Sequence, residues 1–131
     1  MDFASVHGYV IGFGVIGGWA IIAFWSLILR LRKRDEAPVF WRAVSVVQVL
    51  LAVQVLVGGV LLVMGRRPGD GGGGTLLFHL SYALFSPLVV LFFAHKWARD
   101  HRYDPSTIFA VAGLVIFGLT FRAWQVGVFG A

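Results

Sequence analysis

Two histidines and one arginine have side chains whose chemistry differs most from that of their neighbours. His7 stands in ASVHGYV, His79 in LLFHLSY and Arg122 in LTFRAWQ, so each is set in a largely apolar stretch. Imidazole nitrogens bind metals, and a guanidinium binds carboxylates and phosphates through paired N–H groups. Together the three residues could hold a metal-containing cofactor if the fold brings them to one place.

The composition places these residues in a lipid environment. Of 131 residues, 59% are hydrophobic and only 13% are charged, and the mean hydropathy is +0.85. A soluble domain of this length is far less apolar. The chain has no cysteine, which excludes disulfides, thiolate metal sites and iron–sulfur clusters. We therefore expect an integral membrane protein whose main partner is the lipid bilayer.

Four apolar runs approach the length of about 20 residues that a helix needs to cross the hydrocarbon core. They cover about residues 8–29, 43–64, 76–94 and 108–129. Backbone groups in lipid must be paired within their own segment, so each run is expected to be helical. The sequence predicts one all-α domain over residues 1–131, a four-helix bundle with up-down-up-down topology.

The connections between the runs indicate how the bundle is oriented and where its helices begin. Basic residues are most frequent in the first and third connections and less frequent in the second: Arg30, Arg32, Lys33, Arg34 and Arg42 in the first, Lys96, Arg99 and Arg102 in the third, Arg66 and Arg67 in the second. The positive-inside rule then puts both termini outside, in a prokaryotic plasma membrane. Because topology explains the net charge of +5, no nucleic-acid partner is expected.

Local signals in these connections predict further detail. Pro38 suits the first turn of the second helix, and Asp104 followed by Pro105 suits the N-cap and first turn of the fourth. The second connection, GRRPGDGGGGT, has the composition of a flexible linker.

The predicted topology puts His7, His79 and Arg122 at one depth below the outer surface. His7 begins the first helix, His79 lies about one turn inside the third, and Arg122 lies roughly 10 Å below the outer end of the fourth. His95 and His101 belong to the opposite, inner side.

Helical spacing predicts that polar or small side chains share a face with these residues. The expected stripes are His79, Tyr82 and Ser86 on the third helix, Gly118, Arg122 and Gln125 on the fourth, Gly14 and Gly18 on the first, and Gln54 and Gly58 on the second. Charged and amide groups that face lipid are costly, so the stripes are expected to meet in the interior of the bundle.

Haem b fits two imidazoles and nearby cations at this depth. Its iron takes two axial histidine ligands, and its propionates attract arginine. We expect His7 and His79 to be the metal ligands, Arg122 to neutralise one propionate, and Arg66 or Arg67 to meet the other. The full set of expected cofactor-binding residues is His7, His79, Arg122, Gln125, Tyr82, Gln54, Arg66 and Arg67.

This pattern resembles the small membrane b-type cytochromes in which a four-helix bundle holds haem between two histidines. It is also similar to one half of a haem A synthase bundle. The resemblance covers the whole chain, with His7 and His79 as the matching residues, and implies electron transfer, as a quinone- or haem-linked oxidoreductase component with quinone as a further cofactor. Only His95 is well placed at the inner level, so a second haem is not expected, and the absence of an outer-side glutamate does not favour haem A synthase chemistry.

Other interpretations of the same residues remain open. His7 can lie among headgroups, His79 can hydrogen-bond a neighbouring helix, and Arg122 can extend to the outer interface. The glutamines can join helices, and paired glycines can serve close packing or formation of a homo-oligomer. The alternative functions are a non-catalytic structural or assembly subunit of a larger complex, and a small anion-tolerant transporter or channel lined by Arg122, Gln54 and Gln125.

Overall fold

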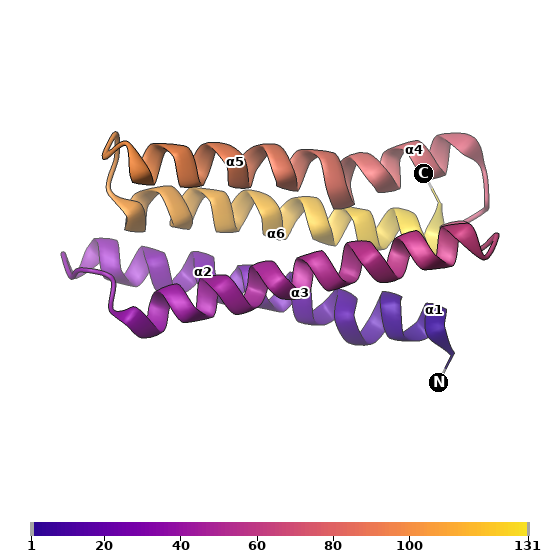
Figure 1. The fold of residues 1–131 in the computed structure, drawn as a ribbon, viewed down its shortest axis with the longest axis horizontal. Coiled ribbons are helices and arrows are strands. Elements are labelled where there is room, and N and C mark those ends of the chain that lie inside the picture. The colour runs from indigo at the N-terminus through magenta and orange to yellow at the C-terminus, as the bar shows by residue number, and fades with distance from the viewer. Residues whose placement is uncertain (1, 131) are drawn as a thin grey trace.

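Four long helical segments run side by side in the computed structural model, which describes residues 2–130 (Figure 1). The first is built from α1 (Phe3–Ser5), the π-helix η1 (Val6–Ile11) and α2 (Gly12–Leu31), the second from α3 (Pro38–Val63), the third from α4 (Gly73–Leu80), the π-helix η2 (Ser81–Phe85) and α5 (Ser86–Arg99), and the fourth from α6 (Pro105–Phe129). The predicted all-α four-helix architecture is confirmed.

All four segments are long and apolar enough to span a membrane, the shortest having 25 residues. This supports an integral membrane protein in contact with lipid. The observed helices extend a few residues beyond the predicted runs, except that the second ends at Val63 with Met64 as its C-cap. Pro38 opens α3, as predicted.

The up-down-up-down course brings the connections to two ends of the bundle (Figure 1). One end, here called the basic end, carries the turns at residues 32–37 and 100–104. The other, here called the terminal end, carries both chain termini and the connection at residues 64–72. Which side of a membrane each end faces stays a prediction.

The core of the bundle lies towards the basic end. Trp19, Phe40 and Phe109 are fully buried there, and the rings of Phe40 and Phe109 meet edge to face with centroids 6.4 Å apart. Gly113 allows α6 to approach α2 so closely that a Cβ at this position would lie 3.0 Å from the backbone nitrogen of Ala23. The result is tight packing of α2, α3 and α6 over half the bundle length.

The helices are unevenly packed around the bundle. The backbone of α6 lies against α2 on one side and against α4, η2 and α5 on the other, whereas α3 lies against η1 and α2 and makes few close backbone contacts with α4, η2 or α5. Near the basic end the side chains of Gln48 and His95 bridge α3 and α5, with His95 Nε2 3.0 Å from Gln48 Oε1.

One prediction about the connections needs correction. The glycine-rich connection is not a free linker, because the Gly69 N–H donates to the Gly127 carbonyl at the end of α6 and the helix α4 already begins at Gly73. Asp104 is the N-cap of α6 and Pro105 its first residue, as predicted, although the Asp104 side chain makes no cap hydrogen bond. Its carboxylate instead lies 3.9 Å from the Arg30 guanidinium on the neighbouring connection.

Candidate cofactor site

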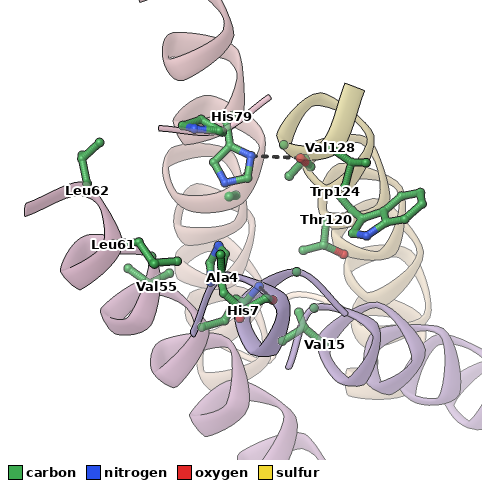
Figure 2. Close-up of a pocket in the computed structure, with 18 of the residues that line it drawn as sticks. Ala4, His7, Val15, Val55, Leu61, Leu62, His79, Thr120, Trp124 and Val128 are labelled. Carbon is green, nitrogen blue, oxygen red and sulfur yellow. Dashed lines mark hydrogen bonds between the residues drawn. The ribbon is translucent and has the colours of Figure 1, made fainter. Parts of the chain in front are cut away.

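A cavity of about 650 Å³ occupies the bundle towards the terminal end (Figure 2). Its walls come from η1 and the start of α2, the second half of α3, α4 with η2, and the last turns of α6. The size falls within the range of about 300–1,000 Å³ typical of small-molecule and cofactor sites. His7 and His79 both line it, so the two histidines expected to meet are brought together.

The two imidazoles face a common space from different helices. Their ring centroids lie 6.3 Å apart and their planes are inclined by 63°. Two histidines that bind one metal atom from opposite sides, with metal–nitrogen distances of about 2.0–2.1 Å, have ring centres roughly 6–6.5 Å apart. The inclination is compatible with such binding, because each ring can turn about its own metal–nitrogen bond.

The orientation of His79 is determined by α6. Its Nδ1 lies 2.9 Å from the carbonyl oxygen of Ala123, and a carbonyl can only accept, so in the neutral imidazole Nδ1 carries the hydrogen and donates it. The lone pair is then on Nε2, which is the nitrogen free to bind a metal. Figure 2 shows this ring reaching across from its own helix to α6.

Gly127 makes this contact with α6 possible. A Cβ at residue 127 would lie 3.0 Å from His79 Cε1 and 3.1 Å from its Nδ1. Any larger residue there would push the ring away from the Ala123 carbonyl, one turn earlier on the same helix. Because Gly127 has no side chain, the His79 ring can pack directly against α6 at this position.

His7 rests on a glycine in the same way. A Cβ at Gly58 of α3 would lie 3.0 Å from His7 Cε1 and 3.5 Å from its Nε2. The Nδ1 of His7 is buried and has no hydrogen-bond partner among the described residues. Buried ring nitrogens without a hydrogen-bond partner are uncommon in folded proteins. This imidazole is held by packing and has a ring nitrogen with no partner among the described residues, as a metal ligand would before the metal binds.

Gln54 holds the backbone at His7. Its Nε2 donates to the His7 carbonyl oxygen over 2.8 Å, and the same oxygen accepts from the backbone N–H of Gly12, five residues along. This i to i+5 bond defines the widened turn η1, and π-helical turns of this kind are frequent at functional sites. The prediction that Gln54 belongs to the site is met by its place in the cavity wall, although its contact is with the His7 backbone.

Arg66 and Arg67 lie at the cavity wall nearest the terminal end, as expected for candidates to meet an anionic group. One Arg66 nitrogen is 4.0 Å from the Asp2 carboxylate, and Arg67 donates to the Gly71 carbonyl at 3.5 Å. Both guanidiniums are partly exposed, and each has further N–H groups that take no part in these contacts. Hydrogen bonds from the hydroxyl and the backbone N–H of Ser5 hold the pKa of the Asp2 carboxyl below its usual value, so Asp2 is charged at neutral pH.

Arg122, Gln125 and Tyr82 do not line the cavity, which corrects the expected convergence of the polar stripes. Arg122 precedes Ala123 by one residue, and one residue is about 100° around a helix. Since Ala123 faces inward, Arg122 is exposed on the outside of α6, with its Nη1 3.4 Å from Gln125 Oε1.

Tyr82 misses the cavity because it lies on the neighbouring face of its helix. The residues of this segment that line the cavity share one face at regular helical spacing: Leu76, His79, Leu80, Ala83 and Leu84. Tyr82 stands about 100° around the helix from Ala83. Tyr82 instead stacks on Phe78, with ring centroids 6.2 Å apart. Gly14 and Gly18 pack against Leu50 and Val47 of α3, which is the close-packing role that the sequence left open as their alternative.

Sequence reasoning missed Ala123 and Gly127. Their signal is the small-xxx-small spacing one residue away from the stripe that contains Arg122. A charged residue drew the prediction to the wrong face of α6, while the functional contact with His79 uses a backbone carbonyl and a missing side chain.

Among residues 2–130, no group of three or more histidine, aspartate or glutamate side chains gathers as a metal site. The histidine pair contributes two ligands, the number that haem iron takes axially in bis-histidine sites. Comparison with models of known protein families, with curated proteins and with solved structures finds no match for this chain.

Proposed function

We propose that this protein binds one haem b between His7 and His79 and serves in electron transfer within a membrane. The observation that carries the proposal is the pair of imidazoles, 6.3 Å apart between ring centroids, at a cavity inside a bundle of four helices able to span a membrane. When bound, the haem would supply reversible one-electron chemistry at its iron.

The residues of the chain have separable tasks in this proposal. The bond from His79 Nδ1 to the Ala123 carbonyl orients the ring and increases the basicity of Nε2, as outer-shell partners of metal-bound histidines do. Gln54 and Gly58 hold the backbone and the ring of His7. Arg66 and Arg67 offer charge-assisted hydrogen bonds to the propionates.

A redox partner dissolved in the membrane could reach the cavity from the side between α3 and α4. These two helices both contribute to the cavity wall but are not packed closely against each other. Elsewhere in the cavity wall, beside Gly12 of α2, the buried Oε1 of Gln54 and Nε1 of Trp124 have no hydrogen-bond partner among the described residues. An acceptor and a donor of this kind suit a quinone, which we propose as the partner.

An absorption spectrum of the detergent-solubilised protein, produced with added haem precursor, tests the haem proposal. The wild type should show a Soret band and, after reduction with dithionite, the split α and β bands of low-spin six-coordinate haem, at one haem per chain. His79→Ala and His7→Ala should each remove the six-coordinate spectrum. His101→Ala is the matched control, because His101 is exposed in the turn at the basic end.

Two results would contradict the proposal. One is a wild-type protein that is helical and monodisperse but colourless even after incubation with excess haem. The other is a His79→Ala variant that keeps the full six-coordinate spectrum.

A further inference from the structure

The exposed side of α6 near the terminal end carries a cation that the cavity does not use. Arg122 lies seven residues before Phe129, the last residue of α6, which is roughly 10 Å along the helix axis. Its side chain is exposed, and its guanidinium offers five N–H donors and no acceptor. Three ion pairs are formed among residues 2–130, and none includes Arg122.

Arg122 belongs to a small polar group on this face. Its Nη1 donates to Gln125 Oε1 over 3.4 Å, which leaves the other guanidinium N–H groups and the amide of Gln125 to donate elsewhere. Gly118, one turn towards the middle of the helix, has open space where a side chain would stand. The N–H donors of Arg122 and Gln125 thus lie one helical turn from the open space at Gly118, on a surface that is otherwise apolar.

Exposed aromatic rings border this group. Phe121 is 41% exposed and stacks on Trp124 with centroids 6.1 Å apart, and Trp124 in turn packs on Phe13 of α2. Tyr9, which is 48% exposed, also meets Trp124 with ring centroids 6.4 Å apart, and tyrosine is enriched where a membrane protein meets the headgroup region. A long arginine side chain anchored at this depth can extend its guanidinium to the same level.

We propose that this face, defined by Gly118, Phe121, Arg122 and Gln125, binds the phosphate of a phospholipid whose acyl chain lies over Gly118. A guanidinium fork matches two phosphate oxygens. A second copy of the chain is a poorer occupant, because a two-fold contact through this face would set Arg122 against its own counterpart. The site is separate from the haem cavity and does not rest on the proposed function.

Native mass spectrometry of the delipidated protein, titrated with defined lipids, measures this binding. The wild type should bind phosphatidylglycerol and phosphatidylcholine more tightly than a phosphate-free galactolipid. Arg122→Gln should weaken the tightest phospholipid association by about fivefold or more, the value of one cation near a lipid headgroup. Arg102→Gln, which removes an arginine at the basic end, is the matched control and should leave this association unchanged.

Arg122→Lys decides the question if the glutamine variant fails to fold. It keeps the charge but loses the bidentate fork, so its phospholipid affinity should lie between those of the wild type and Arg122→Gln. If Arg122→Gln cannot be measured, the affinity of Arg122→Lys should still lie below that of the wild type. Equal phospholipid binding by wild type and both variants would overturn the proposal. So would the absence of preference over the galactolipid, or a photo-crosslinker at position 125 that captures a protein helix in native membranes rather than lipid.

Discussion

The two halves of the bundle are packed differently, although the same four helical segments form both. Towards the basic end, large side chains fill the interior, as the fully buried Trp19, Phe40 and Phe109 show. Towards the terminal end, glycines and short side chains leave a cavity of about 650 Å³, which imidazoles enter from two sides. Val15 and Leu51 belong to both the core and the cavity wall, so the change occurs within about one helical turn.

The difference teaches that the packed half can hold the hollow half open. Cavities in protein interiors are costly because their walls lose van der Waals contacts, and an unsupported one would tend to collapse. Here the close approach of α2 and α6 at Gly113 and Ala23 fixes the spacing of the helices before they reach the cavity. The site is thus positioned by residues that do not touch it.

The largest loss of stability should follow from truncating a large side chain in the packed half. Trp19→Ala is expected to reduce the free energy of unfolding in detergent by about 3–5 kcal/mol, through lost contacts and the space left behind. A matched pair sharpens the comparison: Ile116→Ala, in the packed core, should cost more than Leu61→Ala, which adds only to an existing cavity. Equal losses for these two variants, measured by denaturant titration, would remove the distinction between the halves.

The next effect concerns the glycines behind the histidines. Gly127→Ala should force the His79 ring off the Ala123 carbonyl and weaken haem binding by about 10–100-fold, as loss of an outer-shell partner does. Gly118→Ala, on the same helix but with open space at its Cβ position, is the control and should bind haem like the wild type. Spectroscopic haem titration of both variants makes the measurement, and equal affinities would contradict the role of Gly127.

The same test applies on α3 with neighbouring residues. Gly58→Ala brings a Cβ to 3.0 Å from His7 Cε1, whereas Gly59→Ala meets nothing within 4 Å. We expect the first variant to lower haem affinity or to shift the spectrum towards five-coordinate haem, and the second to have neither effect. A shared loss in both variants would indicate a general effect on the helix instead of contact with His7.

A smaller effect is expected from the hydrogen bond that holds η1. Gln54→Leu removes the bond to the His7 carbonyl and should destabilise the protein by about 0.5–1.5 kcal/mol. If Gln54 positions His7, the variant should also shift the reduction potential of the bound haem, a readout that a purely structural role would not change. Gln48→Leu, six residues earlier on α3 and bonded to His95, is the control for the potential.

The smallest effect concerns acid and the terminal connection. The backbone N–H of Gly72 holds the pKa of the Asp70 carboxyl below its usual value of 3.8. Because the folded-state pKa is the lower one, the carboxylate's contribution to stability is complete above the unfolded value and is lost as pH falls through the folded value. Asp70→Asn should therefore differ least from the wild type in strong acid, with the gap in melting temperature opening as pH rises towards about 4 and staying constant above it. A gap independent of pH would contradict this role.

The fold was largely predictable because lipid leaves few choices to the backbone. Runs of apolar residues had to be helical, and their number required the up-down-up-down course that is observed. Ends of helices were also readable where proline stands at the first turn, as at Pro38. The packing order was not readable, since in lipid the apolar faces of a helix look alike and small residues such as Gly113 decide which helix comes close.

The meeting of His7 and His79 at one cavity was predictable, but their surroundings were not. His7 and His79 were placed correctly because depth in a membrane follows from counting residues along helices. Arg122 was misplaced because the side of a helix that faces inward depends on one residue of rotation, and neighbouring Ala123 carries no polar signal. Tyr82 was misplaced for the same reason, because Ala83, one residue further along the helix, faces the cavity and carries no polar signal.

The wide turn η2 also sets the rotation of the helix segment that precedes it. His79 lies in α4, and η2 joins α4 to α5, which is fixed against α6 beyond Pro87. Winding the five residues of η2 as an α-helix, which turns further per residue than the wider π-helix, would rotate α4 about its axis relative to α5. The His79 imidazole would then turn away from Ala123 and His7, so the π-helical winding of η2 sets the direction in which His79 points.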